Sequence, residues 1–469
     1  MSFRVHFIGI GGVSLSSLAK YMLRMGFTVS GSDARDSVYT EELKRLGASV
    51  FIGHSEKNVE GAQVVVYSDA IKEDNAELAF ARKEKLFIMT RAELLKSVAE
   101  NFGIVIGVAG CNGKTTVTCM LAHIFDAAKK AFTAHIGGED EEFSNSVIRG
   151  SEVFLSEVCE YKKNLLNFPA DVCLCLNCDA DHLDCYNGYD ELKNAYLSYL
   201  KSGDKAIINI DDPVLAGYKE KNAVTFGVKN KAKYGVKNLT EKNGVYSFYL
   251  TENGRKLTKI ALSVAGEYNA VNALAACALA REIGVSAKDI VRGIKKFKGV
   301  KRRYERIGKI NGADVIIDYA HHPKEIAACL SAAEKERAKN ILVVFQPHTY
   351  SRTIFLKDEF IKVLGGVENL YLFRTFAARE APIEGGSALD LYKDLGKGEY
   401  FDDFDKLFSG LTEKLDEGDL LLVLGAGDLA ELFRSRLSNN NGLKVLKTCG
   451  FRASHGLEKT RAFVTLSVC

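Results

Sequence analysis

The sequence predicts an α/β protein of three domains, each built on a parallel sheet. Its 469 residues exceed what one hydrophobic core usually holds, and length alone favours about three domains. Apolar runs typical of strands alternate with helical periodicity from the first residues to about residue 437. Polar residues follow several of these runs, as in parallel sheets that bind ligands at the carboxyl ends of their strands.

Composition and charge favour a soluble globular protein without a nucleic-acid partner. The chain is 47% hydrophobic and 26% charged, and 63 basic against 60 acidic residues give a net charge of +3. The N-terminus lacks a signal-peptide pattern, and no run approaches the roughly 18 apolar residues of a membrane span. We therefore expect a cytoplasmic protein. The eleven cysteines are scattered, so Cys173 and Cys175 are interpreted as packing residues of one strand face in a reducing compartment.

Residues 1–98 predict a first, Rossmann-like domain. A strand over residues 3–8 runs into a turn with Gly9, Gly11 and Gly12, and apolar residues at helical spacing follow over residues 15–23. A second strand ends at Asp33, where a dehydrogenase places its ribose-binding carboxylate. A dinucleotide is one interpretation. Backbone N–H groups at a helix N-terminus bind any diphosphate, so a UDP-sugar is another, and a tight turn without a ligand is the third.

A phosphate-binding loop organises residues 99–298, which predict a P-loop ATPase-like parallel-sheet domain. The strand at residues 104–108 leads into residues 110–116, Gly-Cys-Asn-Gly-Lys-Thr-Thr, and a helix follows. In such a loop Lys114 reaches the terminal phosphates and the Thr115 hydroxyl binds Mg²⁺. The longer form of the motif has glycine at position 108, where this chain has Val108, so only the shorter form is present.

Polar residues at two further strand ends predict a magnesium site beside this loop. Glu157 and Glu160 follow the strand at residues 153–158, and Asn177, Asp179, Asp181, His182 and Asp184 follow the strand at residues 172–176. Mg²⁺ prefers a few hard oxygen ligands, so Glu157 facing Thr115 suits it, and a second ion could lie near His182. The alternative for residues 181–184 is a solvated loop that caps the helix at residues 192–200.

The rest of the central domain continues the strand pattern. Strands are expected over residues 205–211 and 223–228, and a hairpin over residues 245–264 around its Asn-Gly turn. The alanine-rich helix at residues 266–276 carries Asn269 and Asn272 near its start. These amides either contact an adenine or cap the helix, and the sequence favours the cap.

Residues 299–437 predict a third, Rossmann-like domain. It begins with three consecutive cations, residues 301–303, which are either a solvated surface or a contact to ATP. Strands at residues 313–317 and 341–345 each end in a cluster with histidine, tyrosine and proline, which indicates a site. A last strand at residues 420–424 leads to a helix ending near Leu437. Residues 438–469 are interpreted as an appended tail, with disorder as one alternative, because three asparagines and a glycine follow.

These motifs resemble the Mur ligases, which share them in the same order over about residues 3–437. They are residues 9–12, 110–116, 181–184, 269–276, 300–305, 318–323, 345–353 and 425–428. Among Mur ligases, the sequence is most similar to those that join L-alanine to UDP-N-acetylmuramate in peptidoglycan precursor synthesis.

The resemblance implies ATP-dependent amide formation through an acyl phosphate of the muramic acid carboxylate. It implies UDP-N-acetylmuramate, L-alanine and ATP as substrates, Mg²⁺ in two sites, and a monomer or weak homodimer. The implied catalytic residues are Lys114, His182, His348 and Arg352. The implied ATP-binding residues are Gly110, Cys111, Asn112, Gly113, Lys114, Thr115, Thr116, Asn272, Arg303 and Asp318. The residues implied to bind the UDP-sugar are Gly9, Gly11, Gly12, Asp33 and Ser68. Those implied to form the site for the amino-acid substrate are Tyr319, His321, His348 and Arg352. The implied metal ligands are Thr115, Glu157 and His182.

Four positions depart from the commonest family pattern. Cys111 and Asn112 replace a Thr-His pair in the phosphate loop, Asp69 stands where serine is usual beside the uridine, and Thr349 stands where arginine is frequent. Affinity and amino-acid choice are therefore less determined than the reaction class. Two alternatives are a recycling ligase that joins a tripeptide to the same sugar and a non-catalytic nucleotide-binding homologue. A hydride-transfer enzyme is least supported, because nothing resembles a nicotinamide site.

Overall fold

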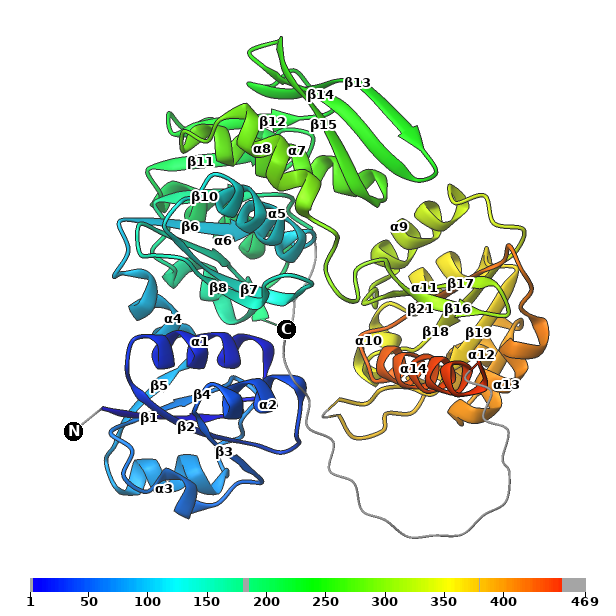
Figure 1. Cartoon of the computed structure of the whole chain (residues 1–469), viewed down its shortest axis with the longest axis horizontal. Coiled ribbons are helices and arrows are strands. Elements are labelled where there is room, and N and C mark those ends of the chain that lie inside the picture. The colour runs from blue at the N-terminus through cyan, green and yellow to red at the C-terminus, as the bar shows by residue number, and fades with distance from the viewer. Residues whose placement is uncertain (1–2, 180–184, 379, 449–469) are drawn as a thin grey trace.

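The computed structural model describes residues 3–179, 185–378 and 380–448 and contains three sheets, one in each domain. Figure 1 shows the first domain (blue) below the central domain (cyan to green), with the third domain (yellow to red) beside them. This arrangement confirms the predicted α/β class with three parallel-sheet domains. Among the described residues, no helix is long and apolar enough to cross a membrane.

The first domain is a doubly wound sheet in the order β3-β2-β1-β4-β5, and all four neighbouring pairs are parallel. Its strands are β1 (Arg4–Ile8), β2 (Thr28–Asp33), β3 (Ser49–Ile52), β4 (Val64–Tyr67) and β5 (Phe87–Thr90). Its helices are α1 (Val13–Arg24), α2 (Val38–Arg45), α3 (Ala76–Lys83) and α4 (Arg91–Ala99). The chain reverses direction across the sheet between β1 and β4, so the glycine loop after β1 lies at the switch point where such folds bind ligands.

The central sheet has the order β15-β14-β13-β12-β11-β10-β6-β9-β7-β8 in the part of the chain described. Its strands are β6 (Ile104–Ala109), β7 (Phe132–Asp140), β8 (Ser144–Ile148), β9 (Val153–Glu157), β10 (Val172–Cys175), β11 (Lys205–Asn209), β12 (Ala223–Gly227), β13 (Tyr234–Lys242), β14 (Val245–Glu252) and β15 (Arg255–Ala265). Its helices are α5 (Lys114–Ala127), α6 (Tyr189–Ser202), α7 (Glu267–Glu282) and α8 (Ala287–Lys296). The phosphate-loop strand β6 pairs with β9 and β10, so the polar residues that follow these three strands share one edge.

The third sheet has the order β16-β17-β21-β18-β19-β20, with only β16 antiparallel among the described strands. Its strands are β16 (Glu305–Ile310), β17 (Ala313–Asp318), β18 (Ile341–Phe345), β19 (Asn369–Phe373), β20 (Glu399–Phe401) and β21 (Leu420–Leu424). Its helices are α9 (Pro323–Glu334), α10 (Tyr350–Phe355), α11 (Lys357–Gly365), α12 (Ala388–Leu395), α13 (Phe404–Lys414) and α14 (Leu429–Thr448).

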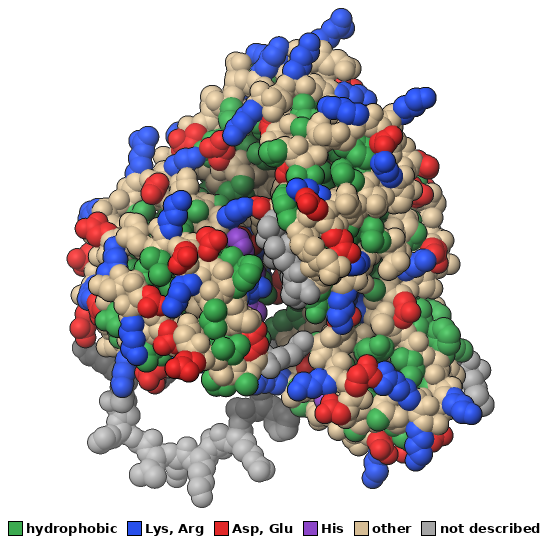
Figure 2. All heavy atoms as spheres, turned by 180° about the vertical axis from the view of Figure 1, so that it is seen from behind, with side chains coloured by type: hydrophobic (Ala, Val, Ile, Leu, Met, Phe, Trp, Pro, Cys, Tyr) green, Lys and Arg blue, Asp and Glu red, His purple; other side chains and the backbone are tan. Residues whose placement is uncertain are grey.

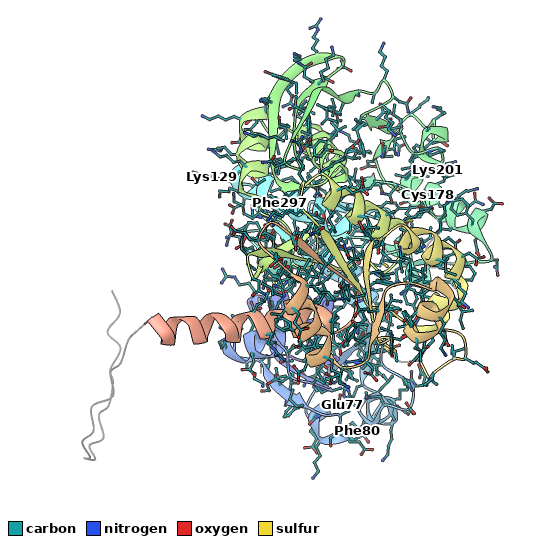
Figure 3. The ribbon with its side chains drawn as sticks, turned by 90° about the vertical axis from the view of Figure 1, so that its right-hand side faces the viewer. Glu77, Phe80, Lys129, Cys178, Lys201 and Phe297 are labelled. Carbon is teal, nitrogen blue, oxygen red and sulfur yellow. The ribbon has the colours of Figure 1, made fainter. Side chains whose placement is uncertain are left out.

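The prediction that the last helix ends near Leu437 is wrong. Helix α14 continues to Thr448 through the three asparagines and the glycine, and Figure 3 shows it projecting beyond the rest of the third domain. Asparagine costs a helix less than about 1 kcal/mol per residue and glycine about 1 kcal/mol, so a helix already formed can continue through them.

Apart from Val300, which packs in the cluster of the central domain, the hydrophobic clusters of the described residues join the first two domains but not the third. One cluster runs from Val5 and Leu18 of the first domain through Phe102 to Phe154 of the central sheet, and the Phe102 and Phe154 ring centroids lie 5.0 Å apart. The clusters on the two faces of the third sheet contain only residues from Tyr304 onward. The first and central domains therefore pack as one body, whereas the third sheet has hydrophobic clusters of its own.

Candidate active site

The loop after β6 leaves the N-terminus of α5 open. Gly113 takes a left-handed conformation with φ +89° at the start of this helix, and no side chain caps it. A Cβ on Gly113 would lie 2.5 Å from Asn272 Oδ1, so only glycine fits this turn. The unpaired N–H groups at such a helix start form a site for phosphate oxygens.

Lys114 folds back over this loop. Its Nζ donates to the carbonyls of Gly110 at 2.5 Å and Cys111 at 3.3 Å. It also lies 3.1 Å from both carboxylate oxygens of Glu160, whose side chain is fully buried. The ammonium group thus lies inside the loop, next to the helix start where phosphates bind.

Thr115 and Glu157 form the candidate metal site. The Thr115 hydroxyl donates to Glu157 Oε2 at 3.0 Å, and the Gly137 N–H donates to Glu157 Oε1 at 2.6 Å. Burial raises the pKa of the Glu157 carboxyl, which a bound cation would reverse. No cluster of three or more histidine, cysteine and acidic side chains suited to a metal occurs in the described ranges. A hydroxyl and one carboxylate, completed by phosphate oxygens and water, fit Mg²⁺.

The two unusual loop residues each bind the loop after β10. The Asn112 N–H donates to Asn177 Oδ1 at 2.9 Å, and Asn177 Nδ2 donates back to the Asn112 carbonyl at 3.0 Å. The Cys111 thiol donates to the Asp179 carbonyl and accepts from its N–H, both at 3.0 Å. Burial raises the pKa of Cys111 to about 12, so the thiol acts as a neutral hydrogen-bonding group.

The favoured interpretation of Asn269 and Asn272 as a helix cap is wrong. The N-cap of α7 is Gly266, and no side chain caps it. Both amides lie inside the helix: Asn269 Nδ2 donates to the Ala265 carbonyl, and Asn272 Nδ2 donates to Asn269 Oδ1 at 3.3 Å. The structure brings Asn272 against Gly113 instead, beside the phosphate loop.

The three cations at the start of the third domain separate into different roles. Lys301 is exposed and pairs with Glu139. Arg302 donates to the carbonyls of Gly425 at 3.0 Å and Gly427 at 2.8 Å, which fixes the end of β21. Arg303 is exposed, and its guanidinium lies 5.3 Å from the Tyr319 ring centroid without a hydrogen bond or ion pair to another described residue.

Asp318 lies buried at the end of β17. It accepts from the N–H groups of Tyr304 at 2.6 Å and Ala320 at 2.7 Å, and burial raises the pKa of its carboxyl. The carboxylate thus holds the segment that carries Arg303 against the strand end. Tyr319 follows it and lies edge-on to His321, with ring centroids 5.4 Å apart.

His321, His348 and Arg352 come together beyond β17 and β18. The two histidine rings lie 5.7 Å apart, and Arg352 Nη1 lies 3.0 Å from His348 Nδ1. Phe376, which the sequence did not single out, stacks on His348 at 5.6 Å from the loop after β19. Thr349 has φ +68° and ψ +151°, a strained backbone for a β-branched residue, and its N–H donates to the Phe376 carbonyl at 3.1 Å.

The glycine loop of the first domain is closed by Asp33. The Gly11 N–H donates to Asp33 Oδ2 at 2.9 Å, so this carboxylate holds the loop itself. Gly9 has φ +87°, and a Cβ there would lie 3.4 Å from the Ser68 Cβ, so Ser68 lies beside the loop. Gly12 is the N-cap residue of α1, and no side chain caps this helix. The unusual Asp69 pairs with Arg91 at 3.7 Å and with Lys162 of the central domain at 3.5 Å.

Of the predicted site residues, Asp181, His182 and Asp184 lie outside the described residues. The three groups of predicted residues occupy strand ends of three different sheets, and Figure 2 shows a hollow between the third domain and the other two. Sequence reasoning named Glu160 but gave it no partner, and it missed Lys324, whose Nζ lies 2.5 and 2.6 Å from the Asp179 carboxylate oxygens. No local pattern reveals a pair 145 residues apart.

Models of protein families match almost the whole length of the chain. The model described as Mur ligase family, catalytic domain, matches residues 4–103, and the Mur ligase middle domain matches residues 108–280. The model described as Mur ligase, glutamate ligase domain, matches residues 302–427.

Individual proteins and a solved structure agree with these models. The chain is 40% identical over 451 residues to UDP-N-acetylmuramate–L-alanine ligase of Clostridium acetobutylicum, covering 93% of this chain and 98% of that protein. It is 39% identical to the protein of the same name from Agathobacter rectalis, covering 91% and 96%. The crystal structure of UDP-N-acetylmuramate–alanine ligase from Thermotoga maritima superimposes with a TM-score of 0.80 at 26% identity, covering 94% and 99%. The chain therefore belongs to the Mur ligase family.

Proposed function

We propose that this protein is an ATP-dependent ligase that forms an amide between the carboxylate of UDP-N-acetylmuramate and the amine of L-alanine, in the cytoplasmic synthesis of peptidoglycan precursors. Relatives of that name at 39 and 40% identity support the substrates. The observation that carries the chemistry is the Thr115–Glu157 pair beside Lys114, since it offers a magnesium site and a cation at one open helix start.

In the first step, a carboxylate oxygen of the sugar attacks the γ-phosphorus of ATP, ADP leaves, and an acyl phosphate forms. Lys114 stabilises the charge on the transferring phosphoryl group, and Thr115 and Glu157 hold Mg²⁺. Arg303 is exposed and its guanidinium lies 5.3 Å from the Tyr319 ring centroid, so it is suited to bind phosphate or ribose oxygens. Asn272 lies beside Gly113 and is suited to orient the nucleotide.

In the second step, the amine attacks the carbonyl carbon of the acyl phosphate. The C–N bond forms, the bond to the phosphate oxygen breaks, and the departing phosphate carries away the proton that the amine loses. Arg352 can bind the carboxylate of the amino acid through two N–H groups, and His348 and His321 lie next to it. The strained Thr349 and the Phe376 ring fix the position of His348, which favours one orientation of a bound substrate.

The finer parts of the proposal concern metal count, oligomer and compartment. We propose two magnesium ions, one held by Thr115 and Glu157 and a second by His182. We propose a monomer or weak homodimer in the cytoplasm, where ATP and nucleotide sugars are available. Sedimentation equilibrium measures the oligomeric state directly.

The test is phosphate release from ATP with a matrix of acceptors. We expect release only when UDP-N-acetylmuramate and L-alanine are both present, with glycine and L-serine as weaker substitutes. Release with the tripeptide in place of L-alanine would instead indicate a recycling ligase. ATP binding without any turnover would indicate a non-catalytic homologue and overturn the proposal.

A further inference from the structure

The buried carboxylate of Glu160 has one described side-chain partner, the phosphate-loop lysine. Both of its oxygens lie 3.1 Å from Lys114 Nζ, and the Glu160 side chain is 0% exposed. The Glu160 carbonyl is fixed as well, because it accepts from the Tyr186 hydroxyl at 2.6 Å and from the Lys163 N–H at 2.9 Å. Because it is enclosed in this way, the Glu160 carboxylate would stay in place if the Lys114 side chain moved.

We propose that Glu160 is a positioning residue that keeps the Lys114 ammonium in the phosphate loop during phosphoryl transfer. This inference rests on the proposed ATP-dependent function. An ammonium group has three N–H donors, and here they are shared among Glu160 and the carbonyls of Gly110 and Cys111. The carbonyl contacts are the ones that phosphate oxygens can replace, since a neutral carbonyl exchanges more cheaply than a buried charge.

The contact with Glu160 therefore persists when nucleotide binds, and Lys114 bridges the carboxylate and the terminal phosphates. A free lysine side chain has four rotatable bonds, and losing its anchor would spread the ammonium over several positions. Glu160 thus reduces the number of positions that Lys114 can take without itself touching the nucleotide.

The main test replaces Glu160 by glutamine, which has the same shape but no charge. We expect Glu160→Gln to lower kcat about 10- to 100-fold, the cost of a small misplacement of a catalytic group. We expect the Kd for Mg·ATP, measured by calorimetry without the sugar, to stay within about threefold of wild type. Glu160→Asp keeps the charge at a shorter reach and should have an intermediate kcat. The matched control is Glu282→Gln, which removes a carboxylate that is 8% exposed and pairs with Lys205 in the same domain.

A double-mutant cycle that combines Glu160→Gln with Lys114→Met tests whether Glu160 acts through Lys114 or has an independent role. Because Glu160 acts through Lys114, Glu160→Gln should cost nothing further in the Lys114→Met background. Lys114→Met alone leaves a buried, unpaired carboxylate, so its Tm should be lower than that of the double variant. The Tm and Mg·ATP measurements need no turnover, so they test the pair even if the proposed substrates are wrong.

Three results would overturn the inference. The first is a kcat for Glu160→Gln within twofold of wild type. The second is the same fold loss in both backgrounds. The third is a kcat loss that excess Mg²⁺ restores, which would make Glu160 a metal ligand instead.

Discussion

Lys324 of helix α9 forms an ion pair with Asp179, with its Nζ 2.5 and 2.6 Å from the two carboxylate oxygens. The thiol of Cys111 donates a hydrogen bond to the Asp179 carbonyl and accepts one from the Asp179 N–H. The pair therefore ties the third domain to a segment that braces the phosphate loop. Lys335 also links the third domain to the central domain, because its Nζ donates to the Tyr246 hydroxyl at 2.6 Å and to Glu267 at 3.1 Å. Since Val300 is the one residue after 298 that the described central cluster contains, such polar contacts help to set the position of the third domain.

Lys324→Ala should loosen the third domain with little loss of stability. Lys324 is 63% exposed and Asp179 36%, so the pair contributes at most about 1 kcal/mol. We expect a larger radius of gyration in X-ray scattering without nucleotide, and a return toward the wild-type value with Mg·ATP. Lys309→Ala is the control, because Lys309 is also 63% exposed but pairs with Asp314 of its own domain. Equal radii for both variants would show that the pair does not hold the domain.

Thr115→Val should raise the Mg²⁺ concentration needed for half-maximal activity by about tenfold or more, because it removes one proposed metal ligand and the hydrogen bond to Glu157. Thr115→Ser keeps the hydroxyl and should stay near wild type. Thr118→Val is the matched control on the same helix: Thr118 is buried and its hydroxyl has no described partner. A Mg²⁺ titration at saturating ATP measures the shift, and an unchanged midpoint in Thr115→Val would remove Thr115 from the metal site.

Glu77 should stabilise the first domain at neutral pH and lose this effect in acid. Its carboxylate is 0% exposed, and Figure 3 shows it in the first domain. Burial raises its pKa, but the nearby His6 ring and the hydrogen bonds from Ser32 and Asn58 more than offset this and bring the pKa to about 2. Because the pKa is depressed in the folded state, the stabilisation is present above about pH 4.5 and is lost as the pH falls toward about 2.

The expected effect of Glu77→Gln follows from that shift. At pH 7 the free energy of unfolding should fall by about 3 kcal/mol, and the difference from wild type should shrink by about pH 3. Urea unfolding followed by circular dichroism measures both values. Glu73→Gln serves as the control, because Glu73 is 73% exposed and its removal should change stability little. A difference that does not depend on pH would refute the assignment.

Local patterns predict much of this molecule, because strands and helices here obey their own periodicity. The strand, glycine turn and helix around Lys114 are where the sequence indicates them, and the hairpin of β14 and β15 turns at its Asn-Gly pair. Cys173 and Cys175 share a buried strand face, as their spacing indicates.

Contacts between distant segments were not predictable in the same way. Asn272 looks like a cap in sequence, but α7 starts at Gly266 and the amide faces Gly113, 159 positions earlier. The pairs Lys114–Glu160 and Lys324–Asp179 depend on how strand ends and domains meet. A charged residue in a loop has many equivalent partners until the fold selects one.

His348 should remain neutral throughout the physiological range. Burial and the nearby His321 and Arg352 lower the pKa of its ring to about 4. A guanidinium only donates, so the contact between Arg352 Nη1 and His348 Nδ1 at 3.0 Å makes Nδ1 the acceptor and places the ring proton on Nε2. The Nε2–H group is then the one available to a substrate.

The pH dependence of kcat/KM for the amino acid tests this assignment together with direct NMR titration of the ring. We expect no inflection from His348 between about pH 5.5 and 7 in the wild type. Arg352→Met removes a neighbouring cation, so the His348 pKa should rise toward its usual value near 6.5 while burial still holds it below. His348→Gln is the control that lacks the titrating ring. A wild-type inflection near pH 6.5 that disappears in His348→Gln would mean that the ring is protonated during catalysis, and that Arg352 turns away from Nδ1 when the substrates bind.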